Sequence, residues 1–121
     1  MYKINFEKPV HVHFIGIGGI SMSGLAEILL RENFTVSGSD NKESALTKHL
    51  ENAGATCFYG QKASNIIDGI DVVVYTAAIR EDNEEWQAAK NAGIPAYHVN
   101  PKAYEQKADY EAELLRYIKE A

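Results

Sequence analysis

The spacing of hydrophobic positions changes at a short run of glycines early in the chain. Apart from His11 and His13, every residue of the segment 10–15 is apolar, which is typical of a central strand covered on both faces. From Ser21 onward apolar residues recur at the spacing of one helical face, and the helix ends at Glu32 and Asn33. These apolar positions are Met22, Leu25, Ala26, Leu29 and Leu30. The pattern predicts a strand that leads almost directly into a helix.

The same alternation of strand and helix continues along the chain. Further strands are predicted at 34–39, 56–59, 71–75 and 94–99, with helices at 44–53 and 83–92 and a last helix at about 102–120. Strands that alternate with helices form a parallel sheet, because each crossover has to be long and right-handed. We therefore expect an α/β fold, a Rossmann-like parallel sheet of about five strands with helices on both faces, plus a C-terminal helix.

A sheet of this kind also predicts where a ligand would bind. In open parallel sheets the ligand lies outside the carboxyl ends of the strands. The loops expected at that edge are 16–22, 39–41, 59–62, 76–83 and 98–100. Binding residues should therefore come from these loops.

Length and charge narrow the class of protein. The chain has 121 residues and a formal net charge of −5, so it has room for one domain and no basic surface of the kind that binds nucleic acid. No segment has the length and hydrophobicity of a signal peptide or membrane helix, which predicts a cytoplasmic protein without a membrane partner. The single cysteine, Cys57, excludes an internal disulfide and is expected to be a small buried hydrophobe.

The glycines between the first strand and the first helix carry the main chemical signal. Gly16 and Gly18 match the first two glycines of the dinucleotide-binding pattern, while Ser21 stands at the third place and Gly19 is additional. Glycine lets backbone N–H groups approach an anion, and the N-terminus of the next helix adds partial positive charge. This predicts a cradle for a phosphate-bearing ligand, with a tight turn that binds nothing as the alternative.

Three other places carry weaker signals. Asp40 closes the second strand, where a carboxylate would accept from a ribose hydroxyl or, alternatively, cap the next helix. Small residues at 76–79 follow a buried strand, either to let a ligand pass close to the backbone or because space requires them. His11 and His13 share one strand face, but nothing is spaced to complete a metal site, so we expect structural histidines.

Complete catalytic signatures are absent from the sequence. It contains no G-x-x-x-x-G-K-[ST] loop for ATP, no G-x-S-x-G nucleophile elbow and no cluster of metal ligands. We therefore expect a binding function, with no catalytic residue and no metal ligand in this chain.

Several stretches of the sequence resemble a known family. They are H-F-I-G-I-G-G-I-S-M-S-G-L-A at 13–26, V-S-G-S-D at 36–40, D-V-V-V-Y-T-A-A-I at 71–79 and D-N-E-E at 82–85. Together they resemble the N-terminal domain of the UDP-N-acetylmuramate:L-alanine ligases, which are Mur ligases of peptidoglycan biosynthesis in the bacterial cell wall. The resemblance spans roughly residues 10–97.

The resemblance implies that this chain holds the UDP moiety of UDP-N-acetylmuramate. In the family, a central domain binds ATP and Mg²⁺ and a C-terminal domain helps to bind the amino acid, so both would be missing partners here. ATP phosphorylates the muramoyl carboxylate, and the alanine amine displaces the phosphate to give an amide. The implied role is that of one domain of an ATP-dependent ligase, without a cofactor of its own and not catalytic by itself.

The resemblance also implies a set of UDP-binding residues. The backbone of 17–21 would bind the diphosphate, Asp40 and its neighbours would bind the uridine, and residues 76–79 with Asn83 would complete the rim. The implied substrate-binding residues are Ile17, Gly18, Gly19, Ile20, Ser21, Ser39, Asp40, Asn41, Thr76, Ala77, Ala78, Ile79 and Asn83.

The expected domain organisation is a UDP-substrate-binding Rossmann-like domain at 1–100 and a helix at 101–121, either part of that domain or the tail of a truncation. Two alternative functions stay open at this point. One is an NAD-binding Rossmann regulatory module, which the glycine loop and Asp40 would also fit. The other is an interaction module that self-associates through its C-terminal helix.

Overall fold

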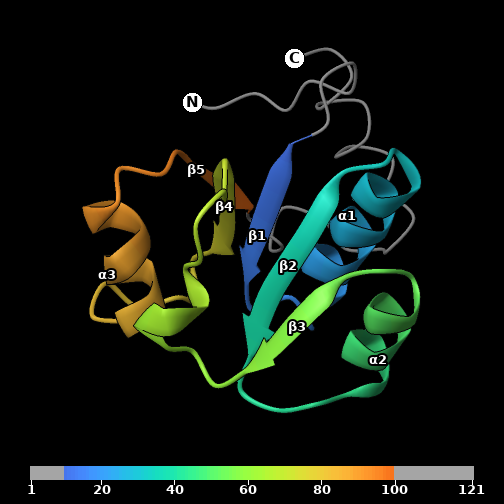
Figure 1. Ribbon diagram of the computed structural model, residues 1–121. Coiled ribbons are helices and arrows are strands. Elements are labelled where there is room, and N and C mark those ends of the chain that lie inside the picture. The colour runs from blue at the N-terminus through green and yellow to red at the C-terminus, as the bar shows by residue number, and fades with distance from the viewer. Residues whose placement is uncertain (1–9, 100–121) are drawn as a thin grey trace.

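The computed structural model describes residues 10–99, which form a parallel five-stranded sheet with helices on both faces (Figure 1). The strands are β1 (His11–Ile15), β2 (Thr35–Asp40), β3 (Thr56–Tyr59), β4 (Val72–Thr76) and β5 (Ala96–Val99). The helices are α1 (Ile20–Arg31), α2 (Ala45–Asn52), the short 3-10 helix η1 (Ala63–Asn65) and α3 (Glu84–Asn91). The expected α/β class is confirmed, and the expected C-terminal helix lies outside the described residues.

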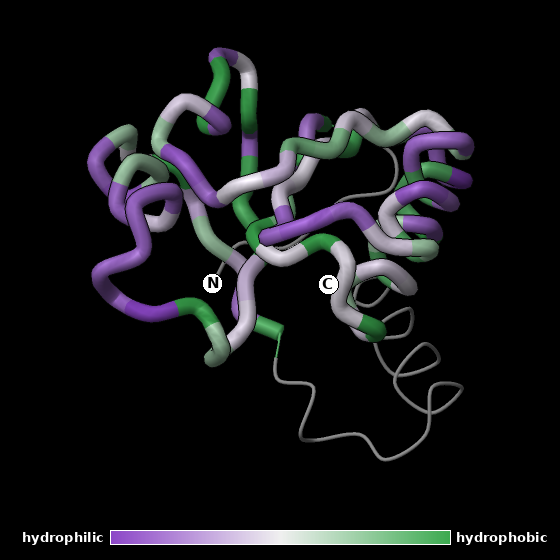
Figure 2. The backbone as a smooth tube through the Cα atoms, turned by 90° about the horizontal axis from the view of Figure 1, so that it is seen from below, coloured by the Kyte–Doolittle hydropathy of each residue, from purple (hydrophilic) through white to green (hydrophobic). Residues whose placement is uncertain are grey.

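The order of the strands determines where a ligand can enter. The sheet order is β3-β2-β1-β4-β5, so the chain moves outward from β1 in one direction and then returns to add β4 on its other side. Helices α1 and α2 cover one face of the sheet, and η1 and α3 cover the other (Figure 1). In an open parallel sheet the binding crevice lies outside the carboxyl ends of the strands at such a reversal. Figure 2 looks onto this edge, where hydrophilic and hydrophobic stretches of the chain meet.

The larger apolar core lies between the sheet and helices α1 and α2. Alternate residues of a strand point to opposite faces, so Val12 and Phe14 of β1 enter this core and His13 and Ile15 lie on the face covered by α3. The fully buried members of this core are Val12, Phe14, Ile17, Met22, Leu25, Ala26, Leu29, Leu50, Val72 and Val74. This core packs α1 tightly on the sheet and so positions the loop that precedes α1.

The face under α3 contains a buried polar network. His13 Nε2 lies 2.5 Å from Glu85 Oε2, and both side chains are fully buried. His13 Nδ1 lies 2.7 Å from Ser37 Oγ, which also lies 2.7 Å from His11 Nε2. Asn65 Nδ2 donates to Glu85 Oε1 at 2.9 Å. The two histidines therefore have structural partners, and the network joins α3 and η1 to the two central strands.

Cys57 packs against the larger core but is only half-buried, so it is less buried than the sequence predicted. Burial, followed by the nearby charges of Glu51 and Asp40, raises the pKa of its thiol to about 11. Only the thiolate is strongly nucleophilic. At pH 8 we therefore expect iodoacetamide to alkylate Cys57 more than about tenfold more slowly in the folded chain than in urea. Intact mass against time measures this rate for the chain's single cysteine, and equal rates would contradict it.

Candidate functional site

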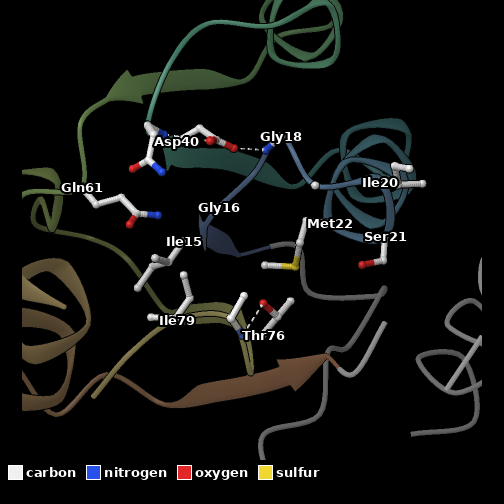
Figure 3. Close-up of a pocket in the computed structure, with 13 residues that line it drawn as sticks. Ile15, Gly16, Gly18, Ile20, Ser21, Met22, Asp40, Gln61, Thr76 and Ile79 are labelled. Carbon is white, nitrogen blue, oxygen red and sulfur yellow. Dashed lines mark hydrogen bonds between the residues drawn. The ribbon is translucent and has the colours of Figure 1, made fainter. Parts of the chain in front are cut away.

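A cleft of about 780 Å³ opens at the carboxyl ends of the central strands (Figure 3). Its size falls within the range of small-molecule sites. It is lined by Ile15, Gly16, Gly18, Gly19, Ile20, Ser21, Met22, Asp40, Asn41, Gln61, Thr76, Ala78 and Ile79. The lining thus comes from the ends of β1, β2 and β4, the first turn of α1 and the loops that follow these strands and β3, which is the edge where the sequence predicted the ligand.

The glycine loop is held in place by β2. The N–H groups of Gly16 and Ile17 both donate to the carbonyl oxygen of Ser39 at 2.8 Å. Gly16 has a φ of +88°, a left-handed conformation that favours glycine and turns the chain sharply out of β1. The side chain of Ile17 is fully buried in the larger core. The loop is therefore a rigid structure and not a flexible flap.

Asp40 binds the glycine loop and does not cap the next helix. Its Oδ2 accepts from the N–H of Gly18 at 2.8 Å, and its Oδ1 accepts from the N–H of Asn41 at 2.8 Å. Helix α2 is instead capped by Ser44, in a capping box with Thr47. The helix-cap alternative for Asp40 is therefore wrong.

The backbone donors left for an anion lie in the first turn of α1. The N–H of Gly19 donates to Gly16 O at 3.2 Å, so the N–H groups before the helix are all engaged. Within residues 10–99, no protein acceptor meets the N–H groups of Ile20, Ser21 and Met22. The first turn of α1 carries no acidic residue, and its N-cap makes no side-chain hydrogen bond. Unpaired donors and the helix dipole thus make this end of the cleft attractive to an anion.

The opposite wall of the cleft is a tight turn after β4. The N–H of Ile79 donates to Thr76 O at 3.0 Å, and the N–H of Ala78 donates to Thr76 Oγ1 at 3.3 Å. This turn brings the side chain of Ile79 into the lining beside Ile15 (Figure 3). Two branched apolar side chains form a floor on which a flat ring can lie.

Gln61 and Asn83 form an amide pair beside this floor. Asn83 is the N-cap of α3, where its Oδ1 accepts from the N–H of Trp86 at 3.0 Å. Its Nδ2 donates to Gln61 Oε1 at 2.9 Å. Gln61 lines the cleft, so one hydrogen bond couples the N-cap residue of α3 to a residue of the cleft lining.

The structure brings most of the predicted site residues together at the cleft. Those that line it are Gly18, Gly19, Ile20, Ser21, Asp40, Asn41, Thr76, Ala78 and Ile79. The side chains of Ile17 and Ser39 are fully buried instead, and Ala77 is exposed outside the lining. Asn83 also lies outside the lining and donates a hydrogen bond to Gln61, which lines the cleft.

Sequence reasoning missed four residues of the lining as named site residues, namely Ile15, Gly16, Met22 and Gln61. Position at the end of a predicted strand was the available signal, since all four lie in or next to loops assigned to the binding edge. Residue type gave no further indication for the two apolar side chains.

The described residues offer no metal centre. Among residues 10–99, no group of three or more His, Cys, Asp or Glu side chains lies together so as to hold a metal ion. The same part of the chain has no helix long and apolar enough to cross a membrane. In the family, the Mg²⁺ that the resemblance implies belongs with ATP in the central domain.

Sheet order, glycine loop and cleft together define a Rossmann-like domain with a site for a phosphate-bearing ligand. The sequence matches the model described as "Mur ligase family, catalytic domain" over residues 11–105. The chain belongs to the Mur ligase family.

Individual relatives agree with this assignment. UDP-N-acetylmuramate–L-alanine ligase of Agathobacter rectalis is 70% identical over 95 residues, which are 78% of this chain and 21% of the relative. The crystal structure of the UDP-N-acetylmuramate-alanine ligase of Thermotoga maritima matches with a TM-score of 0.72 and 31% identity, covering 88% of this chain and 23% of that one. A Neisseria meningitides UDP-N-acetylmuramate:L-alanyl-gamma-D-glutamyl-meso-diaminopimelate ligase matches with a TM-score of 0.69 and 32% identity, covering 75% and 29%. The chain thus spans about a fifth of the length of its curated relative.

Proposed function

We propose that this chain is the domain that binds the UDP moiety of UDP-N-acetylmuramate within a cytoplasmic UDP-N-acetylmuramate–L-alanine ligase. The observation that carries the proposal is the row of unpaired N–H groups of Ile20, Ser21 and Met22, which faces a cleft with a carboxylate and an apolar floor. A nucleoside diphosphate needs all three features, for its phosphates, its ribose hydroxyls and its base.

The relatives support a site for the UDP-bearing substrate in particular. The names of the two ligases with similar structures share UDP-N-acetylmuramate and differ in the second substrate, which is alanine in one and a peptide in the other. A domain common to both fits the substrate that both have in common. The alternative of an NAD-binding regulatory module has no such support, because the three relatives reported above, each more than 30% identical, are ligases.

In this proposal each part of the cleft has one task. The diphosphate accepts from the N–H groups at the start of α1, where the helix dipole adds to the attraction. Asp40 uses two of its lone pairs on Gly18 and Asn41 and accepts from a ribose hydroxyl with the others. Ile15 and Ile79 exclude water from one face of the base. Binding here orients the sugar and its lactate carboxylate toward the remainder of the ligase.

The chemistry would belong to the remainder of the whole protein. An ATP-dependent ligase supplies ATP and Mg²⁺ to activate the carboxylate, and residues 10–99 bring no group of three or more His, Cys, Asp or Glu side chains together. The contribution of these residues is to bind and position the substrate, so they influence KM and orientation.

Thermal unfolding with added ligand tests the proposal. Saturation of a site at 100 times its Kd stabilises a folded domain by about 2.7 kcal/mol, which corresponds to roughly 10 °C for a domain of this size. We expect UDP-N-acetylmuramate to raise the Tm of the 121-residue chain by about this amount, and NAD to leave it unchanged. Protection by NAD without protection by UDP-N-acetylmuramate would overturn the proposal.

A variant of the glycine loop localises the effect. In Gly18→Ala the new Cβ would lie 2.6 Å from Asp40 Oδ2, so the methyl group must displace the carboxylate from the loop. The Tm shift with UDP-N-acetylmuramate should fall by at least half, whereas Lys90→Ala on the last turn of α3 should keep it. A full shift in Gly18→Ala would place the ligand elsewhere.

A further inference from the structure

The orientation of the Gln61 amide is determined by a helix cap. An N-cap side chain has to present an acceptor to the first turn, so the oxygen of Asn83 faces the N–H of Trp86. The amide nitrogen of Asn83 must then face Gln61, and only the oxygen of Gln61 can accept from it. The nitrogen of Gln61 is therefore left to point away from Asn83.

That nitrogen points into the cleft. Figure 3 shows the Gln61 side chain extending toward the cavity from the loop after β3, with its amide nitrogen on the cavity side. Within residues 10–99, no protein acceptor pairs with Gln61 Nε2. A polar donor with a fixed direction and no protein partner is a group to which a ligand can bind.

Gln61 lies at the end of the cleft remote from the first turn of α1, where the unpaired N–H groups could bind an anion. In Figure 3, Ile20 and Ser21 line one end of the cleft, and Gln61 lies at the other end near Asp40. Ile15 and Ile79 lie between Gln61 and the end of β4. A nucleotide whose phosphates meet α1 would extend its base toward Gln61. The amide nitrogen would meet the polar edge of that base, and the two isoleucines its face.

We infer that Gln61 selects the base of the nucleotide by donating to a ring carbonyl oxygen, and that Asn83 is the positioning residue that fixes this donor. The inference rests on the proposed function and adds the residue that reads the base. Uracil carries a carbonyl oxygen at position 4, where cytosine carries an amino group. A donor of fixed orientation pairs with the carbonyl oxygen of uracil but faces another donor in the amino group of cytosine. The site therefore accepts uridine nucleotides and rejects cytidine nucleotides.

Exchange of the donor for an acceptor tests the role of Gln61. We measure the Kd of UDP and of CDP for the 121-residue chain by calorimetry and expect UDP to bind about tenfold more tightly.

In Gln61→Glu, one oxygen still accepts from Asn83 and the other presents an acceptor to the cleft. The added charge weakens both ligands, so the ratio of the two Kd values is the readout. The preference should shift toward CDP by tenfold or more, and Gln61→Met should bring the two ligands to within about twofold.

A substitution outside the lining gives the sharper test. Asn83→Asp keeps an oxygen for the Trp86 N–H, because aspartate caps as well as asparagine. Its second oxygen now faces Gln61, so the Gln61 amide rotates to donate to it and turns its own oxygen toward the cleft. The UDP preference should invert, with an unchanged Tm. Asn83→Ser is the matched control, because serine also caps the helix and is too short to reach Gln61. It should remove the preference without inverting it.

The outcomes separate this inference from the proposed function. A wild-type chain that binds neither UDP nor UDP-N-acetylmuramate contradicts the proposed function. A wild-type chain that binds UDP, with the same ratio of UDP to CDP affinity in Gln61→Glu and Asn83→Asp, overturns the role of Gln61 alone. A merely structural role for Asn83 predicts changes in Tm and none in base preference.

Discussion

Replacing Glu85 by leucine is expected to lower the free energy of unfolding by about 3–5 kcal/mol, which is a large part of the stability of a small domain. The carboxylate is fully buried and meets His13 Nε2 at 2.5 Å and Asn65 Nδ2 at 2.9 Å. A leucine fills the space and leaves both donors facing an apolar group. The cost is therefore the desolvation of two buried polar groups and not the loss of one surface ion pair. Urea unfolding of the 121-residue chain measures it.

Two further variants show whether the network causes the loss. Glu85→Gln keeps an acceptor for one of the two partners, and we expect it to lose only about 1–2 kcal/mol. Glu84→Leu alters the preceding residue, whose exposed carboxylate accepts from the N–H of Ala63, and should cost less than about 1 kcal/mol. If Glu84→Leu and Glu85→Leu destabilise the chain equally, the buried network is not what stabilises α3.

The strands and helices were predictable because each has a local signal. β4 lies in a largely apolar run and β1 in an apolar run interrupted by His11 and His13, and the structure assigns them to 11–15 and 72–76, within one residue of the predicted bounds. The location of the cleft was predictable too, because ligands of open parallel sheets bind outside the carboxyl ends of the strands, whereas the reversal between β1 and β4 is known only from the structure.

The pairing of polar residues was not predictable in the same way. Glu85 stands in the first turn of a helix, where an acidic residue is common on the surface, and only the fold brings it to His13 across 72 positions. Asp40 is a comparable case, because a carboxylate before a helix is an ordinary cap by sequence. Its contact with Gly18 depends on β2 lying beside β1.

The buried network and the cleft are linked through α3. Glu85 anchors the helix to β1, and Asn83 at the start of the same helix orients Gln61 in the cleft. A change in the position of α3 would move the Asn83 amide relative to the loop after β3. A polar contact deep under the sheet thus determines which hydrogen-bond donor the ligand meets.

A single added methyl group should disturb the face of the sheet under α1 and α2 most when it is placed at Gly38. A Cβ added there would lie 2.7 Å from both Cβ and Cδ1 of Ile17 and 2.8 Å from the carbonyl oxygen of Phe14. The carbonyl oxygen belongs to the central strand and cannot move aside, so Ile17 would have to leave its place in the core. Overpacking of this kind costs about 3 kcal/mol. It also shifts the glycine loop, which leads into the first turn of α1, where the unpaired N–H groups lie.

Gly38→Ala should therefore lose about 3 kcal/mol of stability by urea unfolding and also weaken UDP binding in the fraction that stays folded. Gly19→Ala provides the matched control for stability. Its Cβ would meet nothing closer than 3.6 Å, and its φ of −65° suits alanine, so we expect a change below about 0.5 kcal/mol. Because the two variants add the same methyl group, the difference between them isolates the contact with Ile17. Equal stability of Gly38→Ala and the wild type would mean that Ile17 can repack without cost, and the loop would then be less rigid than its hydrogen bonds to Ser39 indicate.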